Sequence, residues 1–293
     1  MKFKSLEVKL SACLRVLICQ TQAAQQHSST AAPEALEALE FPTCEVENSK
    51  TLDVWRFKRM KLPEQQAGPR AQGPYSVSVW GGKGGIGKST DAFLAAYQLG
   101  LVGPTLLINA DKKQDGGGVT ELVSSLKGLP VPFELTETDT AADLAAIRRL
   151  KQFRYVVTDH APYRDEAKLK QAAKADLTIV PDPPRRLDSR AVMSSTKAYL
   201  AGTNYRLHIT MVKHTDKSRA RAMKTSLQDL GLPVFGGWMR YYNAHEMLNG
   251  LTVFEAAAED AQAAKAAEDA YLFGDEILAQ LGESFTVPRL VAK

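Results

Sequence analysis

A glycine-rich stretch holds the residues of this chain whose types and spacing most directly suggest chemistry. It reads Gly81-Gly82-Lys83-Gly84-Gly85-Ile86-Gly87-Lys88-Ser89-Thr90. Glycines at such spacing let backbone N–H groups turn toward a phosphate, and a lysine followed by a hydroxyl residue then reaches the phosphates and Mg²⁺. The pattern from Gly82 to Ser89 is that of a Walker A loop. We therefore expect this stretch to bind a nucleoside triphosphate.

The sequence on either side of the loop is typical of the elements that position such a loop. Residues Tyr75–Trp80 predict a strand leading in, and Asp91–Leu101 predict a helix leading out, with apolar side chains at helical spacing. The start of that helix would add free N–H groups to the phosphate site. We expect Lys88 to reach the β- and γ-phosphates and Ser89 to hold Mg²⁺. The expected nucleotide contacts are Gly84, Gly85, Ile86, Gly87, Lys88, Ser89 and Thr90.

A second lysine, Lys83, stands too early in the loop to be the usual phosphate lysine. By residue type alone it is also consistent with a solvated charge beside an anion site. The run from Lys83 to Thr90, however, resembles the deviant Walker A sequence of the ParA/MinD family of ATPases. A signature lysine of that family crosses a dimer interface to the phosphates of the partner subunit. The resemblance implies this catalytic role for Lys83, and an ATP-bound sandwich homodimer.

Apolar runs alternate with helical stretches from Tyr75 onward, which predicts an α/β fold with a mostly parallel sheet flanked by helices on both faces. The resemblance implies a P-loop NTPase, Rossmann-like fold. Residues 75–293 are the expected ATPase domain. Residues 1–74 lack a sustained period and are expected to form an N-terminal extension and linker. The expected strands are Tyr75–Trp80, Thr105–Asn109, Arg154–Thr158, Leu177–Val180, Arg206–Val212 and Val234–Gly236.

Two aspartates close expected strands, where ligands of parallel sheets gather. The run from Leu106 to Asp111 resembles a family motif that ends in two acids one residue apart, although Asn109 replaces the first acid and Lys112-Lys113 stand where Pro-Gln is common. The resemblance implies that Asp111 positions or activates the attacking water. Asp159 ends an apolar run of Walker B form and is the expected Mg²⁺ residue.

His160 is a second candidate for a base, because it directly follows Asp159. The sequence offers it no orienting acid, so we interpret it as a hydrogen-bonded neighbour of the site.

Composition narrows the class of protein. The chain has 293 residues, of which 44% are hydrophobic and 24% are charged, so it can bury a full core. Its three cysteines, Cys13, Cys19 and Cys44, suggest no disulfide pattern, and no stretch of about twenty apolar residues predicts a membrane span. We expect a cytoplasmic protein. The absence of cysteine after Cys44 disfavours the cluster-binding relatives, and residues 282–293 lack the apolar periodicity of a membrane-binding helix.

Basic residues near the C-terminal third suggest a polyanionic partner, and the formal net charge of the chain is +4. Lys217, Arg221 and Lys224 fall on one face of an expected helix. Such a stripe can track DNA phosphates without reading bases, and it is equally consistent with a solvated face.

The resemblance covers roughly residues 75–281 and includes Val253-Phe254-Glu255, a run similar to small, ParF-like plasmid-partition ATPases. It implies a nucleoid-associated DNA-partition ATPase that binds ATP and Mg²⁺, dimerises and holds nonspecific DNA. Slow hydrolysis, stimulated by a centromere-binding ParB-like protein, would release it. Two alternatives remain open: an adaptor in conjugative DNA transfer or cargo positioning, and a metabolic ATP-dependent synthetase of the same superfamily.

Overall fold

The computed structural model describes residues 62–111, 118–126, 129–138, 140–161, 170, 172–241, 252–257 and 260–290. Seven strands occur there: β1 (Tyr75–Val79), β2 (Thr105–Ala110), β3 (Glu134–Glu137), β4 (Tyr155–His160), β5 (Leu177–Asp182), β6 (Tyr205–Val212) and β7 (Val234–Arg240). The α-helices of these ranges are α2 (Lys88–Val102), α3 (Val119–Ser125), α4 (Ala141–Ile147), α6 (Arg186–Tyr199), α7 (Lys217–Asp229), α9 (Val253–Ala256) and α10 (Ala261–Gln280). A 3₁₀ turn, His214–Asp216, precedes α7.

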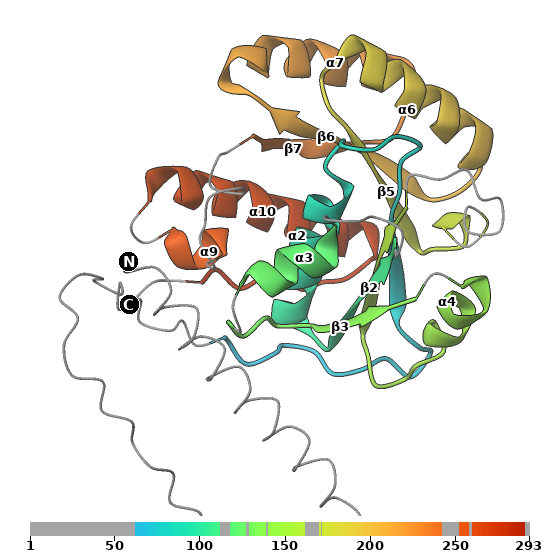
Figure 1. Ribbon diagram of the computed structural model, residues 1–293, viewed down its shortest axis with the longest axis vertical. Coiled ribbons are helices and arrows are strands. Elements are labelled where there is room, and N and C mark those ends of the chain that lie inside the picture. The colour runs from blue at the N-terminus through green and yellow to red at the C-terminus, as the bar shows by residue number, and fades with distance from the viewer. Residues whose placement is uncertain are drawn as a thin grey trace, which may run out of the picture. The chain divides into compact units, whose positions relative to one another are not determined.

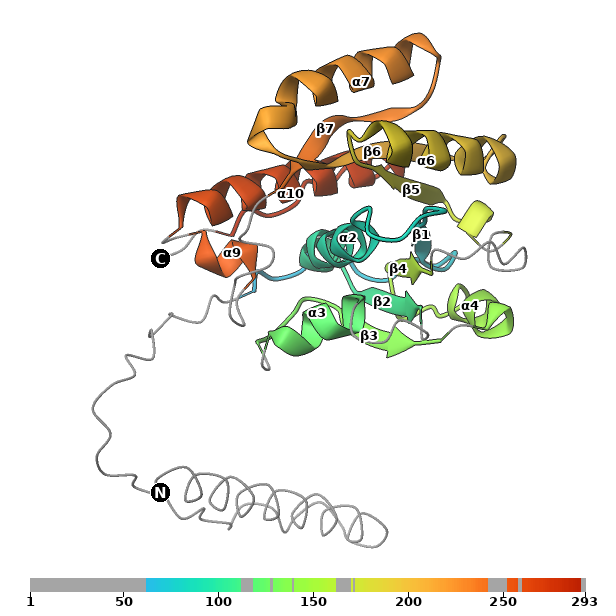
Figure 2. The same ribbon diagram turned by 45° about the horizontal axis from the view of Figure 1, so that its top comes forward.

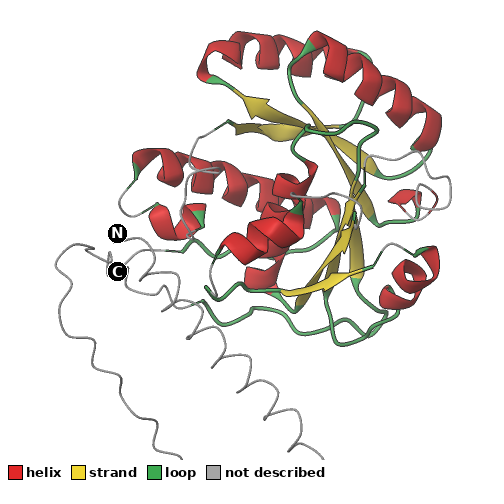
Figure 3. Ribbon diagram, viewed as in Figure 1, coloured by secondary structure: helices red, strands yellow, loops and turns green. Residues whose placement is uncertain are grey.

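The strands form one sheet in the order β3-β2-β4-β1-β5-β6-β7, with every neighbouring pair parallel. They are yellow in Figure 3. Asp159 on β4 lies opposite Val79 of β1 on one side and Asn109 of β2 on the other. The carboxyl ends of these three strands therefore meet at one place, where the chain leaves β1 for the glycine-rich loop.

Helices cover both faces of the sheet (Figures 1 and 2), with α2, α3, α9 and α10 on one face and α4, α6 and α7 on the other. Alternation along each strand sends side chains to both layers. Val77 and Val157 pack under α2 and α10, while Val156 packs toward α4. Helix α2 is buried along nearly its whole length. The glycine-rich loop thus leads directly into a deeply buried helix.

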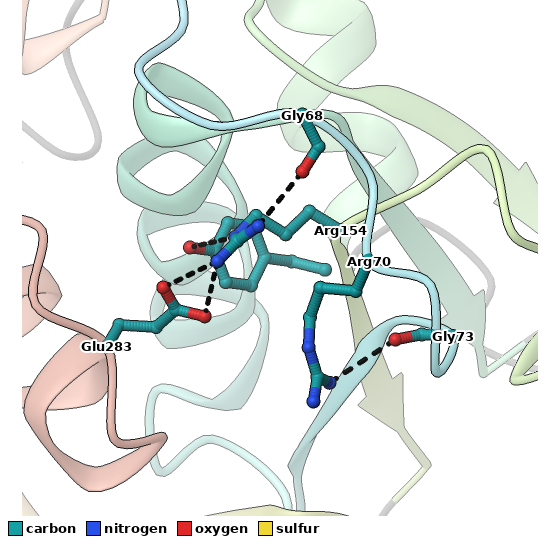
Figure 4. Close-up of polar contacts among 6 residues, drawn as sticks. Gly68, Arg70, Gly73, Arg154 and Glu283 are labelled. Carbon is teal, nitrogen blue, oxygen red and sulfur yellow. Dashed lines mark hydrogen bonds and ion pairs between the residues drawn. The ribbon is translucent and has the colours of Figure 1, made fainter.

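The segment before β1 packs against the domain from Leu62 onward. The Ala67 N–H donates to the Val102 carbonyl at 2.9 Å. Arg154, just before β4, donates to the Gly68 carbonyl at 3.0 Å and to both carboxylate oxygens of Glu283 at 2.9 and 2.8 Å (Figure 4). These contacts hold Ala67 and Gly68, in the segment that leads to β1, against the domain. The rest of the expected extension, residues 1–61, lies outside the described residues.

The predicted fold class is confirmed, and all six expected strands are present. The sequence did not predict β3, because its Glu-Leu-Thr-Glu residues are short and polar, as suits a strand at the edge of a sheet. Strand β7 continues to Arg240, whereas the predicted strand stopped at Gly236. Among the helices in the described ranges, none has both the length and the apolar content that a membrane crossing requires.

Candidate nucleotide-binding site

The glycine-rich loop curves tightly between β1 and α2. Gly87, the residue before α2, has φ 94°, and Gly85 has φ 69°, a backbone region that L side chains rarely adopt. Thr210 on β6 donates its hydroxyl to the Ile86 carbonyl at 2.9 Å and so ties the loop to the sheet. The first amides of α2 are left facing the loop, which is the arrangement of an anion site.

Lys88 folds back along this loop. Its ammonium donates to the Lys83 carbonyl at 3.1 Å, and the side chain is buried. Burial lowers the pKa of Lys88, whereas the carboxylates of Asp159 and Asp111 oppose that shift. The expected phosphate lysine and the two expected acids are therefore electrostatic neighbours. Lys83 itself is exposed on the loop.

Asp159 is 1% exposed, and among the described residues neither of its carboxylate oxygens has a hydrogen-bond partner of ordinary geometry. Burial raises its pKa to about 6, while the nearby Ser89 hydroxyl and Lys88 ammonium oppose the shift. Buried polar atoms rarely stay unpaired without a reason. Mg²⁺ takes oxygen ligands and is commonly held through one or two carboxylates plus phosphates. A buried, unpaired carboxylate beside a serine hydroxyl fits that ion.

Asp111 follows β2, and a network begun by Asn109 holds it. The Asp111 N–H donates to Asn109 Oδ1 at 3.0 Å. The Asn109 amide donates to Thr120 Oγ1 at 2.8 Å, and the Thr120 hydroxyl donates to the Glu137 carboxylate at 2.5 Å. Asn109 Nδ2 also lies 3.4 Å from that carboxylate. An amide suits this position because an acid would face Glu137. Sequence reasoning missed Glu137 because it stands on the unpredicted strand β3.

A cavity of about 450 Å³ opens over the loop and is of the size that small-molecule sites have. It is lined by Gly84, Gly85, Gly87, Lys88, Ser89 and Thr90 from the loop and α2, and by Gly118, Glu121, Leu122 and Ser125 around α3. Of the expected contacts, Ile86 does not line it, because its side chain packs into the apolar cluster with Trp80. His160 is buried, with Nε2 3.2 Å from the Ser78 hydroxyl oxygen.

Comparisons with known proteins find a relative that is similar in sequence and several solved structures that are similar in fold. No protein-family model matches the chain. The maintenance of carboxysome distribution protein A of Gloeobacter kilaueensis is 30% identical over 204 residues, which are 68% of this chain and 93% of that protein.

The solved structures share the fold at low sequence identity. Cyanothece McdA in an ATP complex has a TM-score of 0.53 and 14% identity, over 73% of this chain and 99% of that one. A Borrelia burgdorferi plasmid partition protein bound to AMPPNP has a TM-score of 0.53 and 15% identity, over 71% and 99%. The MinD cell division protein of Aquifex aeolicus has a TM-score of 0.53 and 14% identity, over 73% and 100%.

Proposed function

Because the chain belongs to the ParA/MinD family of P-loop ATPases, we propose that it is an ATP-dependent DNA-partition ATPase. It binds ATP with Mg²⁺ and dimerises. The dimer binds nonspecific DNA in the cytoplasm, at the nucleoid, and dissociates from the DNA after hydrolysis. The single observation that carries the nucleotide chemistry is the cavity over the glycine-rich loop, which Lys88 lines, with Asp159 and Asp111 close by at the ends of the adjacent strands β4 and β2. The remaining steps build on that site and on the family.

The residues of the site divide the work of phosphoryl transfer to water. Gly84–Thr90 would bind the phosphates through backbone N–H groups, and Lys88 would exchange the Lys83 carbonyl for phosphate oxygens. Asp159 and Ser89 would hold Mg²⁺, which neutralises phosphate charge when bound. Asp111 would accept a hydrogen bond from the attacking water. As the water oxygen bonds to the γ-phosphorus, the bond from that phosphorus to the bridging oxygen would break, so that ADP leaves with the bridging oxygen and the phosphate keeps the protons of the water.

Lys83 supplies the link between nucleotide and dimer in this proposal. Lys83 is exposed on the loop, so a second copy can approach this residue. Placed on the phosphates of the partner subunit, it makes ATP bind the dimer more tightly than the monomer. A ligand shifts an equilibrium only by such a preference. ATP would thus assemble the dimer, and hydrolysis, stimulated by a ParB-like centromere-binding protein, would dismantle it.

Cargo positioning is the second candidate function. It is favoured by the Gloeobacter relative, whose name assigns it to carboxysome distribution rather than to a plasmid. Both functions use the same ATP-controlled dimer on nonspecific DNA, and they differ in the cargo and in the protein that stimulates hydrolysis. Identifying the cargo in cells by fluorescence imaging of the tagged protein would separate the two.

The test compares two lysines of one loop. Lys88→Ala should abolish ATP binding, whereas Lys83→Ala should keep ATP binding and lose ATP-dependent dimerisation and DNA retention, as measured by gel filtration and a DNA-binding assay. A Lys83→Ala protein that dimerises with ATP as the parent does would refute the proposal. Rapid turnover by the purified protein without DNA or a second protein would instead favour the synthetase alternative.

A further inference from the structure

A second hollow, of about 420 Å³, lies at the β7 edge of the sheet, where β7 runs between α7 and α10 (Figures 1 and 2). It takes no part in the chemistry described above. Helix α7 contributes Lys217 and Arg221. The apolar part of its lining consists of Phe235, Trp238, Leu272 and Phe273, and the remaining polar side chains are His208, Arg240, Asp269 and Glu276. We call this hollow the edge groove.

The acids of the edge groove are already engaged. Asp269 pairs with the Arg240 guanidinium at 2.6 Å. The Glu276 carboxylate accepts hydrogen bonds from the Gly236 and Gly237 N–H groups, the latter at 2.7 Å. Both carboxylates therefore have their charge or lone pairs satisfied by β7 itself.

The two cations on α7 differ from those acids. Lys217 and Arg221 are exposed, and within the described ranges neither forms an ion pair. The neighbouring Arg219 does pair, with Asp216 at 3.3 Å. The mouth of the edge groove is thus left with an excess of positive charge, which is complementary to an anionic ligand.

The edge groove also has apolar side chains that are accessible. Leu272 on α10 is 48% exposed, although large apolar side chains are mostly buried in the described part of the chain. Trp238 on β7 also lines the groove; it is half-buried and packs with Ala220 on the α7 side of the strand. Tryptophan and arginine are the residues that most often dominate protein interfaces. A ligand that suits this lining carries both negative charge and an apolar side chain.

We propose that the edge groove binds an acidic peptide segment of the protein that stimulates the ATPase. Carboxylates of that segment lie on Lys217 and Arg221, and a leucine or aromatic side chain packs on Trp238 and Leu272. DNA fits this groove less well, because a phosphate backbone has no use for the apolar side chains and would approach Asp269 and Glu276. The identity of the partner as the activator rests on the function proposed above, whereas the binding of the peptide does not.

The floor of the edge groove leads to the nucleotide loop. The His208 ring stacks on Phe273 with ring centroids 4.2 Å apart and planes at 7°. Its Nδ1 shares a 2.7 Å hydrogen bond with the carboxylate of Asp91, in the first turn of α2. Ser89, the expected Mg²⁺ residue, belongs to that same turn. A peptide that presses on Phe273 therefore has a short, packed path to the helix that starts the phosphate site.

The experiment selects peptides from a displayed random library on the full chain. We expect the selected sequences to combine Asp or Glu with Leu, Trp or Phe, and to bind Arg221→Glu and Leu272→Asp at least about tenfold more weakly. Arg219→Glu, on the same helix but outside the groove, is the matched control and should bind them unchanged. Thermal unfolding should show that all three variants, which change exposed side chains, remain folded.

The contrary results overturn different parts of the proposal. No selected peptides, selected peptides that are neutral or basic, or equal loss in Arg219→Glu would each refute the peptide site. If Arg221→Glu lost the binding of random-sequence duplex DNA and kept the binding of peptide, the cations would be assigned to DNA instead. A selected peptide that binds yet leaves a measurable ATPase rate unchanged refutes its role as activator. Peptide binding by a chain with no ATPase activity at all would keep the groove and refute the proposed function.

Discussion

The His208 imidazole and the Asp91 carboxylate are joined by a 2.7 Å hydrogen bond in the interior of the domain, with side chains only 2% and 1% exposed. His208 stands on β6 and Asp91 on α2, so the pair connects the nucleotide-loop helix to the far half of the sheet. Burial raises the pKa of Asp91, and His208 opposes that shift. In the described ranges, the structure shows no other strong polar partner for either group. Each group therefore depends on the other.

Replacing one member of this pair should lower the free energy of unfolding more than replacing both. His208→Phe keeps an aromatic ring against Phe273 and leaves Asp91 buried without its partner, which should lower the free energy of unfolding by about 3 kcal/mol. The double variant His208→Phe with Asp91→Leu should recover a large part of that loss. Urea unfolding of the two single variants and the double variant measures the coupling. If the losses of the single variants simply add, the pair is not coupled as described.

Asp159→Asn should stabilise the nucleotide-free protein at neutral pH. Burial raises the pKa of Asp159 from 3.8 to about 6. Below pH 3.8 the carboxyl is protonated in both states and stability is unaffected. Between pH 3.8 and about 6 the unfolded state ionises while the buried carboxyl stays protonated, so stability falls; above pH 6 both states are ionised and the loss stays constant. The loss is about 3 kcal/mol at neutral pH.

Thermal unfolding across this pH range measures the effect. The parent should lose stability between about pH 4 and pH 7 by an increment that Asp159→Asn lacks, while the exposed Asp229→Asn should follow the parent. In the presence of ATP and Mg²⁺ the order should reverse, because the ligand stabilises only a chain that binds it. An identical pH dependence for parent and Asp159→Asn would contradict the assigned cause.

Asp111→Asn should slow hydrolysis by about a hundredfold while leaving ATP affinity nearly unchanged, because a water-positioning acid acts on the chemical step. Single-turnover hydrolysis and a separate nucleotide-binding titration distinguish the two effects. A variant that loses ATP affinity and rate in parallel would instead make Asp111 part of the binding site.

Asn109→Asp, which restores the more common residue of the family motif, should not improve the enzyme. Its carboxylate would replace an amide that donates to Thr120 and lies 3.4 Å from a Glu137 oxygen. We expect a loss of about 1 to 3 kcal/mol in the free energy of unfolding. Combining it with Glu137→Gln should restore stability, and urea unfolding of both proteins checks this compensation.

Helices α2 and α10 pack closely enough that one glycine is required between them. A Cβ built on Gly274 would lie 2.7 Å from the Gln98 Cβ and 2.9 Å from a Val287 methyl. Gly274→Ala should therefore destabilise the protein by about 1 to 3 kcal/mol. Gly68→Ala, where a Cβ meets nothing within 4 Å, is the matched control and should change the unfolding midpoint little.

The parts of the fold that could be predicted from the sequence are those that depend on patterns among neighbouring residues in the chain. The glycine spacing and the apolar runs each occupy a few consecutive residues, so the loop, six strands and the parallel sheet could be expected. Strand β3 could not, because its Glu-Leu-Thr-Glu residues carry no apolar period and pair only at an edge.

Contacts across the sheet were beyond such reasoning. Asp91 and His208 are 117 residues apart, and neither has a motif around it that would suggest the other. The contact between Asn109 and Glu137 could not be predicted for the same reason, because a hydrogen bond between strands depends on the order of the strands in the sheet. The substitution of Asn109 for an acid is visible in the sequence, and its physical reason is visible only in three dimensions.

The way in which β7 ends the sheet has a consequence for solubility. Edge strands with free N–H and C=O groups invite another chain to extend the sheet, which is a common route to aggregation. Here Glu276 occupies the Gly236 and Gly237 N–H groups, Asp269 accepts from the Arg240 N–H at 3.1 Å, and Lys224 donates to the Gly236 carbonyl. Copies crowded together at high local concentration are thus kept from joining sheet to sheet along this edge.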